Sequence, residues 1–295
     1  MSALEEIRLI LAAAAERVGP AVVGIGDHWR RGSGVVFEPG KVLTNAHNIA
    51  AEAVAIRFAD GRRAEAHVDG ADVDGDLAVL SVDTATVGPI AWPRAERPVG
   101  VGDPVVALSN PTGDALRVTF GFVSGVERAF QGPRGRRIRG SLEHTAPLAP
   151  GASGGPIVSV AGEFLGLNTN RLGDGFYLAI PADADLRKRA EALGRGRTPV
   201  RPRLGIAVAP AHVARHLRRS VGLPERDGVL VRDVEAASRA EAAGLEQGDL
   251  IVRANGQALT DPDDLLAAID RLADGVALEL VAVRGTDERT VRIGA

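Results

Sequence analysis

Residues 150–156 place a single serine, Ser153, in a run of glycine, alanine and proline. Glycine reaches backbone conformations with positive φ that other residues rarely adopt, and it lets another group approach the main chain closely. Apolar residues follow this run at once, at positions 157, 158 and 160. The segment therefore predicts a tight turn that holds one hydroxyl group out beside an apolar part of the fold.

A hydroxyl held on such a turn suits a nucleophile. Attack on a carbonyl group creates a tetrahedral oxyanion, which needs backbone N–H donors aimed at it from the same turn. The N–H groups of Gly151 and Ser153 can supply these two donors. A serine among glycines is by itself most often an ordinary turn residue. The hypothesis therefore requires a base and a carboxylate elsewhere in the chain.

Both groups occur upstream, at the ends of predicted strands. Residues 34–37 and 42–47 read as a hairpin joined by residues 38–40, and His47 lies at the end of the second strand. Asp76 precedes residues 77–82, an apolar run of buried-strand length. Taken alone, His47 is a solvent-exposed or core-edge histidine and Asp76 a turn or cap residue. Together with Ser153 they follow the chain order of the chymotrypsin-like double β-barrel, which differs from that of subtilisins and α/β-hydrolases.

Six segments between residues 18 and 181 carry a resemblance to a known family in the expected order. They are residues 32–36, 43–47, 76–80, 109–113, 151–156 and 178–181. With these segments the chain resembles the HtrA/Deg (high-temperature-requirement) serine proteases. The resemblance implies that Ser153 attacks the scissile carbonyl, that His47 transfers the proton and that Asp76 orients the imidazole. The N–H groups of Gly151 and Ser153 would then form the oxyanion hole.

Two positions depart from the usual pattern of that family. Ala152 stands before the serine, where these enzymes commonly carry asparagine, and Asn48 follows the histidine, where an aliphatic residue is usual. Neither change removes a group of the expected triad. Because the oxyanion donors belong to the main chain, Ala152 should leave them available, although it can loosen the turn.

The resemblance also implies a substrate pocket lined by Leu148, Arg171 and Phe176. Two of these side chains are apolar, so we expect cleavage after small or medium aliphatic residues in segments exposed by unfolding. If the Arg171 guanidinium points into the pocket, a polar or acidic side chain would be preferred instead.

Residues 204–295 resemble the PDZ domains attached to these proteases. The matching segments are a carboxylate-binding loop and strand at 204–208, a strand at 228–234, a short helix at 238–245, a strand with an Asn-Gly turn at 248–256, and an amphipathic helix at 261–272 with Leu265, Leu266, Ile269 and Leu272 on its inner stripe. The backbone N–H groups of Leu204, Gly205 and Ile206 would hold the carboxylate of a peptide C-terminus that adds as a strand.

The length of 295 residues suits two domains. We expect an N-terminal helical segment (1–17), a double-barrel protease domain (18–193) closed by a surface helix, a linker (194–203) and an α+β PDZ domain (204–295). The fold class is therefore mainly β. The arginines of the linker lack interleaved aromatic residues, so a solvated linker is favoured over a nucleic-acid site.

Composition excludes several kinds of chemistry. The chain has no cysteine, hence no disulfide and no thiolate ligand, and its net charge of −3 gives no nucleic-acid signature. His212 and His216 lie four residues apart on an expected helix, but no third ligand is evident. The aspartates near Asp76 lack the spacing of a calcium loop. We expect neither a metal nor a cofactor. With aromatic residues at 3% of the chain, the core must consist of Val, Leu, Ile and Ala.

The N-terminal segment gives an expectation about location. Its glutamates precede a short apolar run, which is neither a secretory leader nor long enough to span a bilayer. This predicts a cytoplasmic protein that does not bind membranes. A chain from which a leader had been removed would look the same, so the cell envelope or periplasm is the alternative. In the family resembled, this segment commonly helps to build a trimer.

The function expected is that of a serine endopeptidase that cleaves unfolded or damaged proteins, with a PDZ module that binds peptide C-termini. Its partners would be unfolded polypeptides, peptide C-termini and further copies of the same chain. The alternative, from a different class, is a catalytically silent chaperone or adaptor that presents the PDZ module.

Overall fold

The computed structural model describes residues 2–26, 32–93, 98–111, 113, 115–132, 137–199, 203–270 and 276–294. The chain divides into two compact units, Met1–Pro199 and Val200–Ala295. Each unit has its own sheets and its own buried apolar clusters, and each is described by itself.

The first unit begins its β structure with a closed barrel of antiparallel strands in the order β1-β2-β3-β6-β5-β4. The strands are β1 (Val22–Ile25), β2 (Gly32–Glu38), β3 (Lys41–Thr44), β4 (Ala53–Arg57), β5 (Arg63–Asp72) and β6 (Leu77–Ser81). The hairpin predicted around residues 38–40 is β2–β3, in which Glu38 pairs with Lys41. Gly40 has a φ of +77°, which glycine adopts without strain at this turn.

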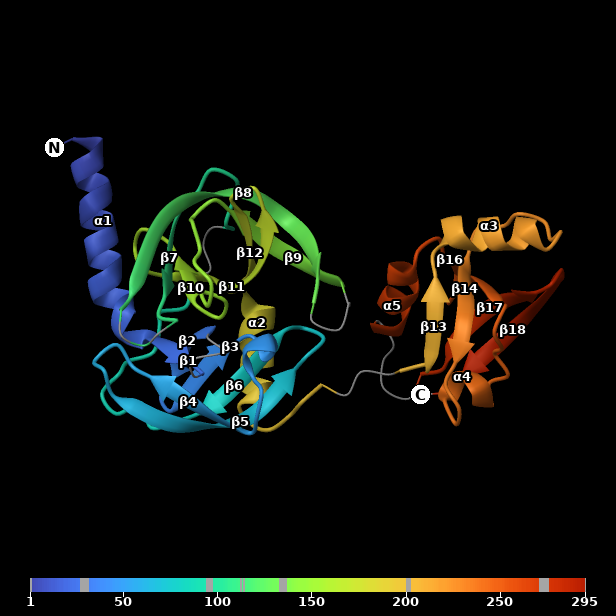
Figure 1. Ribbon diagram of the computed structural model, residues 1–295, viewed down its shortest axis with the longest axis horizontal. Coiled ribbons are helices and arrows are strands. Elements are labelled where there is room, and N and C mark those ends of the chain that lie inside the picture. The colour runs from blue at the N-terminus through green and yellow to red at the C-terminus, as the bar shows by residue number, and fades with distance from the viewer. Residues whose placement is uncertain are drawn as a thin grey trace. The chain divides into compact units, whose positions relative to one another are not determined.

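A second closed barrel follows, in the order β10-β11-β12-β9-β8-β7. Its strands are β7 (Pro104–Ser109), β8 (Arg117–Gln131), β9 (Arg137–His144), β10 (Pro156–Val158), β11 (Phe164–Gly173) and β12 (Phe176–Pro181). Figure 1 shows the two barrels one above the other. The segment that contains Ser153 connects β9 to β10.

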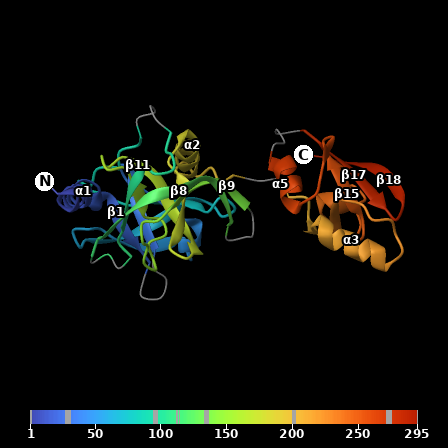
Figure 2. The same cartoon turned by 90° about the horizontal axis from the view of Figure 1, so that it is seen from above.

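Two α-helices cover the outside of this unit. Helix α1 (Ala3–Val18) begins at Ser2, whose hydroxyl caps the N–H of Glu5, and it packs along β7 and β8. Helix α2 (Ala184–Leu193) begins at Asp183, whose carboxylate caps the N–H of Leu186, and it packs on β5 and β6. Both helices lie at the outside of the unit in the second view (Figure 2).

Aliphatic side chains make up most of the core, as the composition predicts. The largest buried cluster spans both barrels and consists chiefly of Val, Leu, Ile and Ala, with the rings of Phe58 and Phe164 fully buried. Alternation in the strands places these residues inward, so that each barrel is filled with side chains. The cores hold in place the loops that carry the candidate site.

The second unit contains a sheet in the order β13-β14-β15-β17-β18, with β16 paired to β15. Its elements are β13 (Ile206–Ala209), α3 (Ala211–Ser220), β14 (Val229–Val234), α4 (Arg239–Ala242), β15 (Leu250–Ala254), β16 (Gln257–Ala258), α5 (Pro262–Asp270), β17 (Leu278–Arg284) and β18 (Asp287–Ile293). The predicted Asn-Gly turn joins β15 to β16, with Asn255 at φ +47°.

The predicted amphipathic helix of this unit is α5. Leu265 and Ile269 are buried in its apolar cluster and Leu266 is half-buried, whereas Leu272 lies outside the described residues. The fold-class prediction is thus confirmed: a mainly β chain with two barrels followed by an α+β unit. No helix within the described ranges combines the length and the apolar character that crossing a membrane requires.

Candidate active site

His47 and Asp76 lie at the ends of neighbouring strands of the first barrel. His47 belongs to a 3-10 turn, Ala46–Asn48, that is separated from the end of β3 by Asn45 alone. Asp76 ends the connection between β5 and β6, and β3 pairs with β6. Asp76 has a φ of +52°, an uncommon conformation for a residue other than glycine. Such outliers cluster at functional sites, where the surrounding structure maintains them.

The Asp76 carboxylate is buried, and its oxygens accept several hydrogen bonds. Nδ1 of His47 lies 2.9 Å from both Oδ1 and Oδ2, and the His47 N–H donates to Oδ1 at 3.1 Å. The Thr169 hydroxyl donates to Oδ2 at 2.6 Å. Because a carboxylate only accepts, Nδ1 carries a proton, and in the neutral ring Nε2 then has a free lone pair. This is the tautomer that a general base needs.

The main chain of Asp76 is held as well. Its carbonyl oxygen accepts a hydrogen bond of 3.0 Å from the Asn45 side chain, which is fully buried. Both ends of Asp76 are therefore fixed, and the His47 ring is fixed through it. The His47 side chain stays 36% exposed, so a substrate can reach its other nitrogen.

Ser153 lies between two glycines with positive φ, Gly151 at +84° and Gly154 at +85°. Its hydroxyl donates to the carbonyl oxygen of Thr169 at 2.9 Å. Thr169 therefore contacts both Asp76, through its side chain, and Ser153, through its main chain. Within the described residues, Nε2 of His47 has no hydrogen-bond partner, so Ser153 and His47 are not directly bonded in this arrangement.

The two expected oxyanion donors are the N–H groups of Gly151 and Ser153. In the described part of the chain neither of them donates to another protein group. The N–H groups on either side are engaged differently, because Ala152 donates to Ala149 and Gly154 donates to Asn168. Two unpaired N–H groups next to the half-buried hydroxyl of Ser153 are the elements from which an oxyanion site is made.

Sequence reasoning missed Thr169 and the buried residues beside it. His144 is fully buried at the end of β9, with Nε2 2.9 Å from Oδ1 of Asn168 and its ring stacked on Tyr177 at 5.8 Å. Burial lowers the pKa of His144 to about 4, and the hydrogen bond with Asn168 offsets this only in part. His144 is neutral near pH 7 for this reason. No local pattern marks these residues, since their partners are distant in the sequence.

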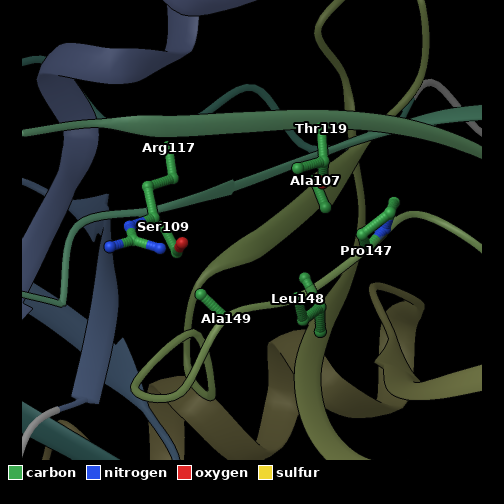
Figure 3. A pocket seen from close by; sticks show the side chains of 7 residues that line it. All are labelled: Ala107, Ser109, Arg117, Thr119, Pro147, Leu148 and Ala149. Atoms are coloured by element: carbon green, nitrogen blue, oxygen red, sulfur yellow. The ribbon is translucent and has the colours of Figure 1, made fainter. Parts of the chain in front are cut away.

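The predicted pocket residues occupy different surroundings. Leu148 lines a cavity of about 290 Å³ together with residues of β7 and β8 and its neighbours on the loop. Pro147, Leu148 and Ala149 lie on one side of this cavity, facing Ala107, Ser109, Arg117 and Thr119 on the other (Figure 3).

Arg171 and Phe176 do not line this cavity. Arg171 is exposed, with its guanidinium carbon 5.7 Å from the centre of the Tyr177 ring, and Phe176 is 39% exposed where β12 begins. The pocket formed by Leu148, Arg171 and Phe176 thus stays a prediction.

In the second unit, two of the predicted peptide-binding residues, Leu204 and Gly205, directly precede β13, and the third, Ile206, is its first residue. Among the described residues this strand pairs with β14 alone, so it forms an edge of its sheet. Leu204 is buried in the apolar cluster with Leu265 and Ile269 of α5, and Gly205 has a φ of +78°. Within the described residues the N–H groups of Leu204 and Gly205 donate to no other protein group. A sheet edge preceded by unpaired N–H groups suits an added strand.

The other residues considered in the sequence were histidines and aspartates that could bind a metal. In the structure they are exposed or paired with a cation. His212 and His216 are exposed on α3. Asp69 is paired with Lys41 at 2.7 Å and Asp72 with Arg189 at 3.1 Å. In the portion of the chain that the structure describes, no group of three His, Cys, Asp or Glu side chains has the arrangement of a metal site.

Comparisons with known proteins define the class of domain to which each part of the chain belongs. Residues 32–167 match the family model of a trypsin-like peptidase domain, and residues 202–294 match that of a PDZ domain. The solved structure of the HtrA-type protease AlgW with a decapeptide superimposes with a TM-score of 0.77 at 26% identity, covering 96% of this chain and 97% of that one.

Curated relatives identify the family. A putative serine protease HhoA of Synechocystis is 32% identical over 268 residues, 86% of this chain and 68% of that protein. A probable periplasmic serine endoprotease DegP-like of Halomonas elongata is 31% identical over 269 residues, 89% of this chain and 55% of that protein. The chain belongs to the HtrA family of serine proteases and has a trypsin-like peptidase domain and one PDZ domain. It spans about half the length of the Halomonas relative.

Proposed function

We propose that this chain is a serine endopeptidase in which Ser153 is the nucleophile, His47 the general base and Asp76 the residue that orients the base. The observation that supports this most directly is the His47–Asp76 pair, with Nδ1 2.9 Å from both carboxylate oxygens. Thr169 joins this pair to Ser153, since it donates to Asp76 and accepts from the Ser153 hydroxyl. Membership of a serine protease family supports the same assignment.

Catalysis begins when the Ser153 hydroxyl leaves Thr169 and turns to Nε2 of His47. Its oxygen attacks the amide carbonyl carbon while its proton passes to Nε2, and the carbonyl oxygen becomes the oxyanion. The intermediate collapses when the C–N bond breaks and His47 returns the proton to the leaving amine. A water molecule, deprotonated by His47, then hydrolyses the acyl ester and restores Ser153. The N–H groups of Gly151 and Ser153 stabilise the oxyanion in both halves of the reaction.

The test combines labelling with turnover. A fluorophosphonate probe should label Ser153, and the protein should degrade unfolded casein, whereas Ser153→Ala should abolish both. Casein degraded at the same rate by Ser153→Ala would refute the assignment. The alternative of a silent adaptor predicts no labelling at any pH while peptide binding is intact. The HtrA relationship favours the protease over the adaptor.

For the second unit we propose binding of peptide C-termini along the edge of β13, with the carboxylate on the N–H groups of Leu204, Gly205 and Ile206. The apolar cluster beneath Leu204 would take the last side chain. A fluorescent peptide with an apolar C-terminal residue should bind, and the same peptide with an amidated C-terminus should bind much more weakly. Equal affinity for both peptides would exclude a carboxylate site.

As substrates we propose unfolded or damaged proteins, in the role of quality control, cut after small or medium aliphatic residues. The half-buried Leu148 and the partly exposed Phe176 would supply apolar walls, and Arg171 would lie at the rim. A peptide library profile should show preference for Val, Ala or Leu at the cleaved position. A dominant preference for Lys or Arg would contradict the pocket.

We propose the cell envelope as the location, in place of the cytoplasm expected from the N-terminal sequence. The Halomonas relative is named periplasmic, which supports the envelope alternative and leaves the cytoplasmic expectation without support. We further propose a homotrimer built through α1, where Leu4 and Leu9 are 79% and 42% exposed. Sedimentation equilibrium should give three times the chain mass, and Leu4→Glu should lower it.

A further inference from the structure

The residue after the proposed base, Asn48, makes contacts that an aliphatic side chain could not. Its Nδ2 donates to the Thr44 hydroxyl at 3.0 Å and to the carbonyl oxygen of Ser153 at 2.9 Å. Asn48 is 8% exposed. Both hydrogens of its amide group are therefore used, and one of them is bound to the main chain of the proposed nucleophile. Asn48 lies in the first barrel, whereas Ser153 lies on a loop of the second.

Two carbonyl groups of the nucleophile loop are held from the first barrel. The Ser153 carbonyl accepts from Asn48 and also from the Ser33 N–H at 2.8 Å. The Gly151 carbonyl accepts from the Ser33 hydroxyl at 2.9 Å. The Gly151 carbonyl belongs to the peptide group before the one that contains the Ser153 N–H, and the Ser153 carbonyl belongs to the peptide group after it. These bonds therefore fix the peptide groups on both sides of that N–H. The direction of that N–H, an expected oxyanion donor, depends on the loop staying in this conformation.

Glycines enclose the Asn48 amide. A Cβ atom added to Gly32 would lie 2.4 Å from Cγ of Asn48, and one added to Gly154 would lie 3.0 Å from Nδ2. The amide therefore occupies the space that side chains at these two positions would need, and only glycine lets it lie there. Its two hydrogen bonds then orient it toward Thr44 and the Ser153 carbonyl.

The loop itself has no side-chain amide to perform this task. Ala152, which precedes the serine, is buried and can make no side-chain hydrogen bond. We propose that Asn48 is a positioning residue, which holds the Ser153 carbonyl from the first barrel and so maintains the nucleophile loop in its reactive shape. This inference rests on the proposed protease function. It gives Asn48, which departs from the usual family pattern, a role in the rate of acylation.

Asn48→Leu is the first test, because leucine has the same branching at Cγ and no donor. The Ser153 carbonyl keeps its bond from Ser33, so the change leaves no carbonyl of the loop without a donor. A slightly misplaced nucleophile predicts a kcat about 10-fold to 100-fold lower with KM nearly unchanged. The rate of fluorophosphonate labelling at Ser153 should fall by a similar factor, because it requires no substrate binding.

Thr84→Val is the matched control. Thr84 is a buried residue of the same unit whose hydroxyl accepts from the Gly40 N–H at 3.0 Å. The variant loses one buried side-chain bond to the main chain without touching the site, and it should keep the kcat and labelling rate of the wild type. A folded Asn48→Leu that matches the wild type in both rates overturns the proposal. Absence of labelling in the wild type would instead overturn the protease function.

Asn48→Ala decides the question if the leucine variant does not fold, because alanine is smaller and also lacks the donor. The kcat and the rate of fluorophosphonate labelling should again fall about 10-fold to 100-fold, with KM nearly unchanged. Wild-type rates in a folded Asn48→Ala, or insolubility of both variants, would overturn the proposal.

Discussion

The two halves of the candidate site are held in different ways. The half in the first barrel, His47 with Asp76, is fixed by the hydrogen bond within the pair and by side-chain hydrogen bonds from two neighbours, Asn45 and Thr169. The half on the second barrel, Ser153, is held through the carbonyl groups of its loop, while its hydroxyl is bonded to Thr169. The base is ready before substrate arrives, whereas the nucleophile must turn.

This difference shows where the chain can regulate its rate. A base in a fully satisfied network of buried hydrogen bonds is held rigidly. A nucleophile held by its loop depends on every residue that supports that loop. Mutations of His47 or Asp76 should therefore abolish turnover, whereas mutations of the residues around the Ser153 loop should lower it by graded amounts.

The largest effect is expected from Asp76→Asn. The substitution leaves the shape of the site but removes the charge and favours the wrong tautomer of His47, so kcat should fall by roughly 10⁴-fold. The matched control is Asp74→Asn, the same chemical change on a half-exposed residue of the same turn, which should leave kcat unchanged. The measurement is casein or peptide turnover with the active sites counted by fluorophosphonate. A loss of only a few-fold would mean that the first half is not fixed by this carboxylate.

An effect of intermediate size is expected on the stability of the fold at acid pH. It comes from His144 in the second barrel. The folded pKa of His144 is about 4, below the ordinary value of 6.5. Above pH 6.5 the residue is neutral in both states and contributes nothing to pH dependence. As pH falls from 6.5 to 4, the unfolded state takes up the proton first, so stability is lost over this interval. The free energy of unfolding should fall by roughly 3 kcal/mol from this residue.

Urea unfolding at several pH values measures this contribution of His144 to the free energy of unfolding. Both tryptophans, at positions 29 and 92, belong to the first unit, so their fluorescence reports that unit alone. The difference in stability between wild type and His144→Gln should decrease by roughly 3 kcal/mol on going from pH 7 to pH 4. The exposed His67 provides the matched control His67→Gln, which removes a histidine of the same unit that is not buried. Parallel pH curves for wild type and His144→Gln would contradict the burial argument.

The smallest effect is expected from Thr169→Val, which removes the hydrogen bond between the two halves. Valine has the shape of threonine, and the Thr169 carbonyl that holds Ser153 is unaffected. A hydrogen bond to a charged group is worth about 1.5 to 3 kcal/mol, so kcat should fall about 10-fold or somewhat more. Thr169→Ser keeps the hydroxyl and should restore most of the activity. A loss as large as that of Asp76→Asn would show that the first half is not held independently of the second.

Much of this arrangement could be predicted from the sequence, because its signals are local. The β2–β3 hairpin, the strand after Asp76 and the capped helix α2 each follow from the residues they contain. The order of His47, Asp76 and Ser153 then indicated the double barrel. The PDZ unit was recognisable for the same reason, since its strands and turns carry their own patterns.

The parts that sequence reasoning missed depend on contacts between distant residues. Thr169 lies 93 residues from Asp76, and Asn48 lies 105 residues from Ser153. Neither residue has a local pattern that indicates its partner. In the sequence, Asn48 stood out only as a departure from the family pattern. Its contact with Ser153 is formed only in the folded protein. His144 gave no signal at all, because burial is a property of the fold.

The edge strand β13 has a consequence for how strongly the second unit can hold a chain end. It has only four residues, Ile206–Ala209, so an incoming strand gains few main-chain hydrogen bonds. Short edges also discourage pairing between copies of the same protein. Most of the affinity must then come from one terminal carboxylate and one apolar side chain. We expect rapid exchange of chain ends at this edge, which suits a module that samples many polypeptides and retains none of them for long.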